Sequence, residues 1–257
     1  MAGLPETWTL RLHGVGNASA VELGSAMATI ERNDRPWLTI DCGGEGLSAY
    51  LQHYGDMPGA LFMTHAHLDH VAGFERLFVA SYFDAARRGE TRLYVPVTLL
   101  PLLHRRVASY PNVLAEGGAN FWDAFRVVPV GDDFWHDGLR LEVFPTRHHW
   151  PDTSFGLRLR GSMAWTGDTR PIPEMLAKFA DAGELVAHDC ALHGNPSHSG
   201  LDDLEREYPR ELLARCLLYH YGSAAEGEAL AAKGYRVAHP GEVVPLNAPD
   251  AAAVEPA

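Results

Sequence analysis

The stretch Thr64-His65-Ala66-His67-Leu68-Asp69-His70 places four potential metal ligands within six positions, directly after the apolar run Leu61-Phe62-Met63. The apolar run predicts a buried strand, so the polar side chains would lie on the loop that leaves the sheet. His65 and His67 are two apart and point to the same side of an extended chain, whereas the adjacent Asp69 and His70 must point differently. Because one zinc ion takes three or four ligands, this cluster of two pairs predicts two metal ions and further ligands elsewhere in the chain.

Length and composition are those of a single globular domain. The chain has 257 residues, of which 46% are hydrophobic and 21% charged, and we expect one domain over residues 1–246 with a disordered tail at 247–257. No apolar run approaches the roughly 18 residues of a membrane span, and the N-terminus lacks the pattern of a signal peptide. Three cysteines form no framework, which indicates a reducing compartment. The expected localisation is cytoplasmic.

The charge balance bears on the partner. The formal net charge is −12 with His neutral, whereas proteins that hold long nucleic acids usually carry clustered Lys and Arg. The pairs Arg87-Arg88 and Arg105-Arg106 lie in helix-like stretches, and we interpret them as solvated faces. A small-molecule substrate is therefore expected, a large nucleic acid is not, and a homodimer is left open.

Hydrophobic periodicity predicts two blocks of strands, each followed by helices, and hence a sandwich of two sheets with helices outside. The expected strands are near 8–12, 27–31, 37–40, 61–63, 92–95, 125–130, 139–144, 155–159, 163–165, 184–187 and 217–219. The expected helices are near 46–54, 69–88, 99–109, 172–182, 201–216 and 224–233. The segments Phe121-Trp122 and Phe134-Trp135 are expected either to wall a pocket from loops or to form core or dimer contacts.

Three later segments offer the missing ligands, each just after a strand-like run. The first contains His148 and His149, the second places Asp168 at the glycine turn Thr166-Gly167-Asp168, and the third ends an apolar strand at His220. In this order the motifs resemble the metallo-β-lactamase superfamily of αβ/βα metallohydrolases. The resemblance covers most of the chain and implies a four-layer sandwich of two mixed sheets.

The superfamily pattern implies a complete ligand set. The first metal would take His65, His67 and His149, the second would take Asp69, His70 and His220, and Asp168 would bridge them. His149 is favoured over His148 because His149-Trp150-Pro151-Asp152 ahead of Phe155-Gly156 fits a frame common in the family. His148 would then face the substrate. Asp41 resembles the early aspartate that braces the histidine loop without binding metal.

Two further segments are similar to the ribonuclease Z-like branch, namely Ala187-His188-Asp189-Cys190-Ala191 and Pro196-Ser197-His198-Ser199-Gly200. The resemblance implies that Asp189 orients His198, which protonates a leaving oxygen. The alternative is that His198 only caps a helix beginning near Leu201. Residues 70–149 lack the basic arm of ribonuclease Z, which speaks against tRNA processing more than against phosphodiester chemistry.

These residues predict hydrolysis. Two divalent ions that share a water lower its pKa from about 15.7 towards 7, which supplies a hydroxide nucleophile, and a general acid such as His198 adds about 10²–10⁴ in rate. We predict a phosphodiesterase for a cyclic or short nucleotide, with zinc as the default metal and Mn or Fe also suited to the ligands. The alternatives are a lactonase or thioesterase, a tRNA 3′-end endonuclease, and a metal-loaded binding or sensor protein with low turnover. Arg170, after the bridging acid, is expected to reach a substrate phosphate or to form a structural ion pair.

Overall fold

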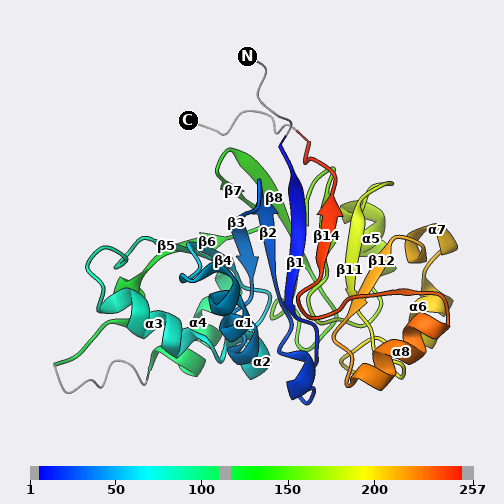
Figure 1. The fold of residues 1–257 in the computed structure, drawn as a ribbon, viewed down its shortest axis with the longest axis horizontal. Helices are drawn as coiled ribbons and strands as arrows, with labels where there is room; N and C mark the ends of the chain where they lie inside the picture. Colours follow the sequence, from blue (N-terminus) through cyan, green and yellow to red (C-terminus); the bar gives the residue numbers. More distant parts are fainter. Residues whose placement is uncertain (1–5, 110–116, 251–257) are drawn as a thin grey trace.

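Two seven-stranded sheets form the centre of the computed structural model, which describes residues 6–109 and 117–250 (Figure 1). In spatial order the first sheet contains β14 (Val243–Leu246), β1 (Trp8–Gly14), β2 (Met27–Arg32), β3 (Arg35–Ile40), β4 (Ala60–Phe62), β5 (Thr91–Pro96) and β6 (Phe125–Val130). The second contains β13 (Arg236–Val237), β12 (Cys216–Tyr219), β11 (Leu185–Asp189), β10 (Met163–Trp165), β9 (Phe155–Leu159), β8 (Leu139–Pro145) and β7 (Asp133–His136).

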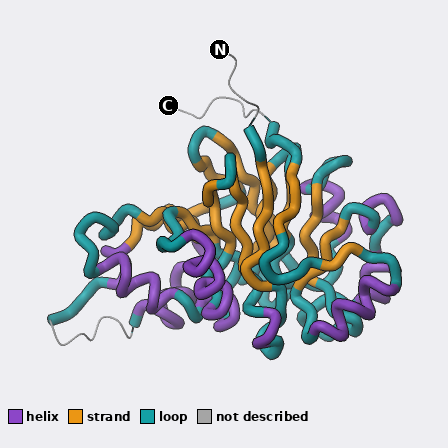
Figure 2. The backbone as a smooth tube through the Cα atoms, in the orientation of Figure 1, coloured by secondary structure: helices purple, strands orange, loops and turns teal. Residues whose placement is uncertain are grey.

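Helices cover both outer sides of the paired sheets, as Figure 2 shows in purple around the orange strands. The first sheet is covered by α1 (Gly44–Tyr54), α2 (Leu68–Val71), α3 (Phe74–Tyr82) and α4 (Leu100–Leu103). The second is covered by α5 (Pro173–Phe179), α6 (Leu201–Glu207), α7 (Arg210–Leu213) and α8 (Ala224–Ala232). Short 3-10 turns lie at Val21–Leu23, Val97–Leu99 and Phe121–Ala124, and a π-helical turn at His104–Ala108. This is the four-layer sandwich that the sequence predicts, and that prediction is confirmed.

Each sheet is half antiparallel and half parallel, and this positions the site. Strands β3 to β6 run parallel in the first sheet, as do β10 to β13 in the second. The carboxyl ends of parallel strands meet at one edge of a sheet, where ligands bind in α/β folds. The histidine loop follows β4, Asp168 follows β10, and His220 follows β12. All three therefore converge on the same end of the sandwich.

Burial distinguishes the two alternatives for the aromatic segments Phe121-Trp122 and Phe134-Trp135, a pocket wall or core contacts. Phe121 is fully buried and stacks on Phe78, and Phe134 is buried and stacks on Tyr94. Phe134 lies in β7, a strand that the sequence did not predict. Neither segment lines the two cavities near the histidine cluster in the described part of the chain. Both phenylalanines are core residues, and the expectation that these segments wall the pocket is wrong.

Several expected boundaries differ from the structure for local reasons. The helix expected at 201–216 is divided into α6 and α7 at Tyr208-Pro209, because the residue before proline is driven to extended backbone. The helix expected at 69–88 is divided at Gly73 and ends at Tyr82. Part of the expected disordered tail is bonded to the fold, since the Asn247 side chain donates to the carbonyl of Gly183 at 3.0 Å. Residues 251–257 lie outside the described residues. No helix in the described ranges combines the length and apolarity needed to cross a membrane.

Candidate metal centre

Asp41 holds the start of the histidine loop. Its backbone is left-handed, with φ of 63°, and its carboxylate is buried at the end of β3. One oxygen accepts the Thr64 N–H at 2.8 Å and the other accepts the Thr64 hydroxyl at 2.7 Å. The second oxygen also lies 2.8 Å from Nδ1 of His70. Asp41 thus braces the loop that carries the first four donors.

Two groups of donor atoms meet at Asp168. Each group keeps its donors within 4.8 Å of one another: the first is His65, His67, His148 and Asp168, and the second is Asp69, His70, Asp168 and His220. The Asp168 carboxylate lies 3.5 Å from Nε2 of His65, 3.4 Å from Nε2 of His70 and 3.2 Å from Nε2 of His220. Adjacent ligands of a tetrahedral ion with bonds of about 2.0–2.1 Å are about 3.4 Å apart. The spacing therefore fits two ions that share one carboxylate.

Unpaired buried atoms support the same interpretation. Nε2 of His70, Nε2 of His220 and both carboxylate oxygens of Asp168 are buried and lack a hydrogen-bond partner among the described residues. Buried polar atoms are nearly always paired, and leaving several unpaired in one place is costly. All four atoms face the space between the donors, where divalent cations would pair with them. The residues present fit a dinuclear metal centre.

Hydrogen bonds fix the remaining ring nitrogens of the donor histidines. Nδ1 of His65 lies 3.0 Å from the Thr64 hydroxyl oxygen, which donates its own proton to Asp41. Nδ1 of His148 lies 2.9 Å from the carbonyl of Ser197. Such outer partners orient a ligating imidazole and select its tautomer. In both rings they leave Nε2 free to face the other donors.

The structure places His148, and not His149, among the grouped donors. Nε2 of His148 lies 3.0 Å from Nδ1 of His67, and the ring is buried. The exposed His149 meets His67 on the other side of its ring, with the two Nε2 atoms 2.8 Å apart. The family frame favours His149, whereas the donor group contains His148. Which of the two binds a metal ion stays a prediction. His149 has the position of an outer partner, because its Nε2 lies on the side of the His67 ring that faces away from the other donors.

The pKa directions separate two kinds of histidine. Burial lowers the pKa of His148 to about 4 and lowers that of His65 well below its ordinary value, so both rings are neutral, as ligands must be. Burial acts in the same direction on His220, but Asp168 and Asp189 outweigh it and raise its pKa to about 10. Their carboxylates therefore favour positive charge at this point, whether it is a proton or a metal ion.

Asp189 and His198 form the acid–histidine pair that the sequence predicts. Nδ1 of His198 lies 3.0 Å from one oxygen of the buried Asp189, which also accepts the Thr169 N–H at 2.9 Å. The other oxygen faces Nδ1 of His220 at 3.4 Å. Burial would raise the pKa of Asp189, but the charge of His220 and these hydrogen bonds outweigh it and lower the pKa. Helix α6 is capped by Gly200, so His198 is not its cap.

Two cavities open beside the donors. The first cavity, of about 770 Å³, is lined by His65, Ala66, His67, Leu102, Arg105, Arg106, His148, His149, Trp150, Pro151, Thr153, Arg170, Pro196 and Ser197. The second cavity, of about 750 Å³, is lined by Asn17, Ala18, Ser19, Glu45, His67, Leu68, Asp69, Ala72, Arg106, Asp168, Ala191, Asn195, His198 and His220. His67 and Arg106 line both. In the sequence Arg105 and Arg106 looked like a solvated helix face, and no local signal marked them as cavity residues.

The fold and the paired donor groups define the class: the chain is a metal-dependent hydrolase of the metallo-β-lactamase fold. Solved structures with this fold include the protein YhfI from Bacillus subtilis (TM-score 0.72, 14% identity, covering 93% of this chain and 99% of that one). They also include a diphosphatase of the PhnP family (TM-score 0.73, 17% identity, covering 92% and 97%).

Within this class the chain belongs to the family described as anti-Pycsar protein Apyc1, whose model matches residues 8–244. A relative of that name from Saccharibacillus brassicae is 32% identical over 225 residues, which are 84% of this chain and 91% of the relative. The family match therefore includes every residue of both donor groups.

Proposed function

We propose that this hydrolase cleaves a small phosphodiester, a cyclic or short nucleotide. The observation that carries the proposal is the Asp189–His198 pair, because the buried Asp189 holds His198 where it lines the second cavity beside Asp168. The leaving group of a phosphodiester is an alkoxide, which is a poor leaving group, so its cleavage gains most from a proton donor. The similarity to a diphosphatase adds support, because that name describes phosphorus chemistry.

The proposed ligands follow the donor groups. His65, His67 and His148 would hold one ion, Asp69, His70 and His220 would hold the other, and Asp168 would contact both. Zinc is the metal we propose, since imidazole and carboxylate suit it, although Mn and Fe accept the same donors. Ions bound there supply Lewis acidity, which activates water and neutralises charge on the phosphoryl oxygens.

The protein's own groups then have separate tasks. His198 uses Nδ1 to bind Asp189, so its Nε2 is the atom that gives a proton to the leaving oxygen. Its side chain is 23% exposed, which lets it reach a substrate while Asp189 fixes its orientation from below. Asp41 and Ser197 keep His70 and His148 in place during the reaction. We propose the ribonuclease Z-like arrangement for this chemistry and a small molecule for the substrate.

The test is a substrate panel with the metal-loaded protein. The panel contains bis(p-nitrophenyl) phosphate, 3′,5′-cyclic nucleotides, a γ-lactone, a thioester and a precursor tRNA. We expect turnover of the phosphodiesters, with cyclic nucleotides preferred. Turnover of the lactone or thioester without phosphodiester cleavage would contradict the proposal, and 3′-end cleavage of the tRNA would replace the small substrate by a large one.

A further inference from the structure

The first cavity differs in charge from the rest of the protein. Three arginines line it, Arg105, Arg106 and Arg170, and no Asp or Glu is among its lining residues in the described part of the chain. The second cavity, by contrast, is lined by the carboxylates of Glu45, Asp69 and Asp168. In a chain with a formal net charge of −12, three cations that line one cavity without an Asp or Glu in its described lining raise the local potential and attract anions.

These arginines are not committed to structural ion pairs. Within residues 6–109 and 117–250 none of the three pairs with a carboxylate, and the hydrogen bonds of Arg105 and Arg170 go to the carbonyls of Pro101 and Arg147 at 3.4 and 3.3 Å. Arg106 lies in the π-helical turn His104–Ala108, a kind of turn that is frequent at functional sites. A guanidinium presents paired N–H groups that match two phosphate oxygens. The cavity can therefore bind a phosphate on guanidinium groups that form no ion pair with the described residues.

Trp150 gives the same cavity an aromatic surface. Its side chain is 82% exposed, and its ring makes no aromatic contact with the residues that the structure describes. Its backbone is nevertheless held in place, because the Thr153 hydroxyl donates to the Trp150 carbonyl at 2.7 Å, and Asp152 adopts a left-handed turn with φ of 59°. The exposed indole therefore offers a free ring face at the cavity, and nucleobases stack on such faces.

We propose that the first cavity is a nucleotide subsite. The arginines Arg105, Arg106 and Arg170 bind the phosphate, and the Trp150 ring stacks on the nucleobase. This inference rests on the proposed function, since it names the part of the substrate that determines specificity. The volume of the first cavity, about 770 Å³, lies in the roughly 300–1,000 Å³ range of small-ligand sites. The phosphate lies where His67 and Arg106 border both cavities, which brings the scissile bond next to His198.

The stacking half of the proposal is tested by calorimetry on the metal-loaded protein. Ribose 5-phosphate and a nucleoside 5′-monophosphate differ only in the base, so the ratio of their dissociation constants measures the base contribution. We expect the nucleotide to bind about 5- to 100-fold more tightly. W150A should bring this ratio close to one, and W150F should retain most of it.

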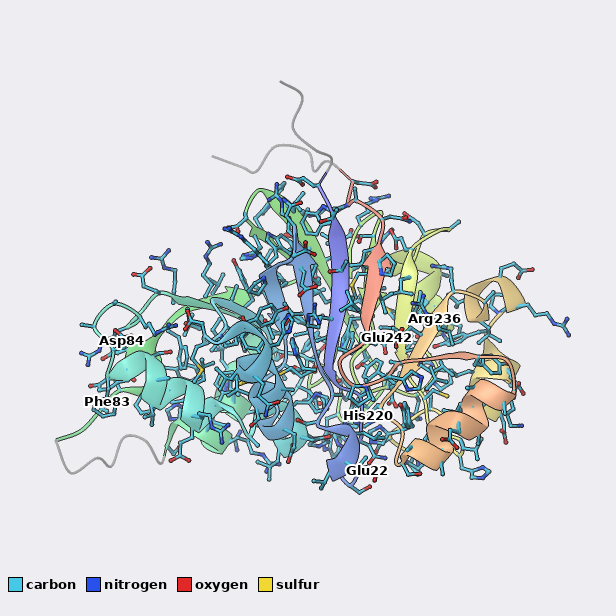
Figure 3. The ribbon with its side chains drawn as sticks, in the orientation of Figure 1. Glu22, Phe83, Asp84, His220, Arg236 and Glu242 are labelled. Atoms are coloured by element: carbon cyan, nitrogen blue, oxygen red, sulfur yellow. The ribbon has the colours of Figure 1, made fainter. Side chains whose placement is uncertain are left out.

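A matched control is Phe83, an aromatic side chain that is 54% exposed and lies beyond α3, far from His220 in Figure 3. F83A should leave the ratio unchanged. If W150A keeps the wild-type ratio, Trp150 does not stack on the base, and the proposal of a nucleotide subsite is overturned. The ligands are not cleaved, so this result does not depend on whether the protein proves to be a phosphodiesterase.

The phosphate half is tested with R106A in the same titrations. Both ligands should bind about 10-fold more weakly than to the wild type, with an unchanged ratio, because the two share the phosphate. R35A is the control, since Arg35 is exposed and lines neither cavity. Equal affinities in R106A and R35A would show that the arginine does not bind the phosphate and would overturn this part.

Discussion

The first and second cavities share His67 and Arg106 but have opposite characters. The first offers arginines and an exposed indole, whereas the second offers carboxylates and His198, which is hydrogen-bonded to the buried Asp189. The first is suited to recognition because its arginines form no ion pair within the described residues. The second is suited to catalysis because it places His198 beside the Asp168 carboxylate. The two donor groups lie where these regions meet.

The strongest test of this division is the removal of the carboxylate that both donor groups share. D168N should lose both metal ions and reduce phosphodiester turnover below detection, because Asp168 is common to both sets. Metal content by mass spectrometry should fall from about two ions per chain towards none. The exposed Asp202 gives the control D202N, which should keep both ions. If D168N retained two ions, the two donor groups would not be joined through this residue.

A smaller effect should separate the two adjacent histidines of the first cavity. H148A should remove one ion per chain, since His148 is a grouped donor. H149A should keep two ions but lower the affinity for the ion of the His148 donor group by about 10- to 100-fold, as is usual for the loss of an outer partner. Competition with a chelator measures both affinities. Equal loss in the two variants, or the larger loss in H149A, would restore the assignment made from the sequence.

The smallest expected effect concerns the scaffold beneath the second cavity. The loop at residues 15–19, which contributes to the lining of the second cavity, follows β1. In β1, burial and the nearby charge of Arg11 lower the pKa of His13 to about 3. The unfolded chain binds this proton below about pH 6.5, so His13 stabilises the fold above that pH and the contribution is lost as the pH falls towards 3. H13Q should therefore lose less stability than the wild type between pH 6.5 and 4, by about 1–3 kcal/mol. Urea unfolding at several pH values measures this difference, and parallel stability curves would contradict it.

Much of the fold and most donors could be predicted from the sequence because strand ends and ligand motifs are local patterns. The choice between His148 and His149 could not, since both fit the turn and only the packed position of His67 separates them. Arg105 and Arg106 were missed for a related reason. A helical pattern shows which side chains are polar, whereas the cavity they line is formed by distant segments around Trp150 and Pro196. Strand β7 was missed because its four residues are too short for a clear alternation.

The central claim is that His198 in the second cavity protonates the leaving oxygen, and its most direct test compares leaving groups. A cyclic nucleotide has an alkoxide leaving group. With two ions bound, H198A should therefore slow its cleavage by a factor on the order of 10²–10⁴. The same variant should cleave bis(p-nitrophenyl) phosphate nearly as fast as the wild type, because p-nitrophenoxide needs little protonation. H193A, from the same loop but outside both cavities, should leave both rates unchanged. An equal loss on both substrates in H198A would contradict the account.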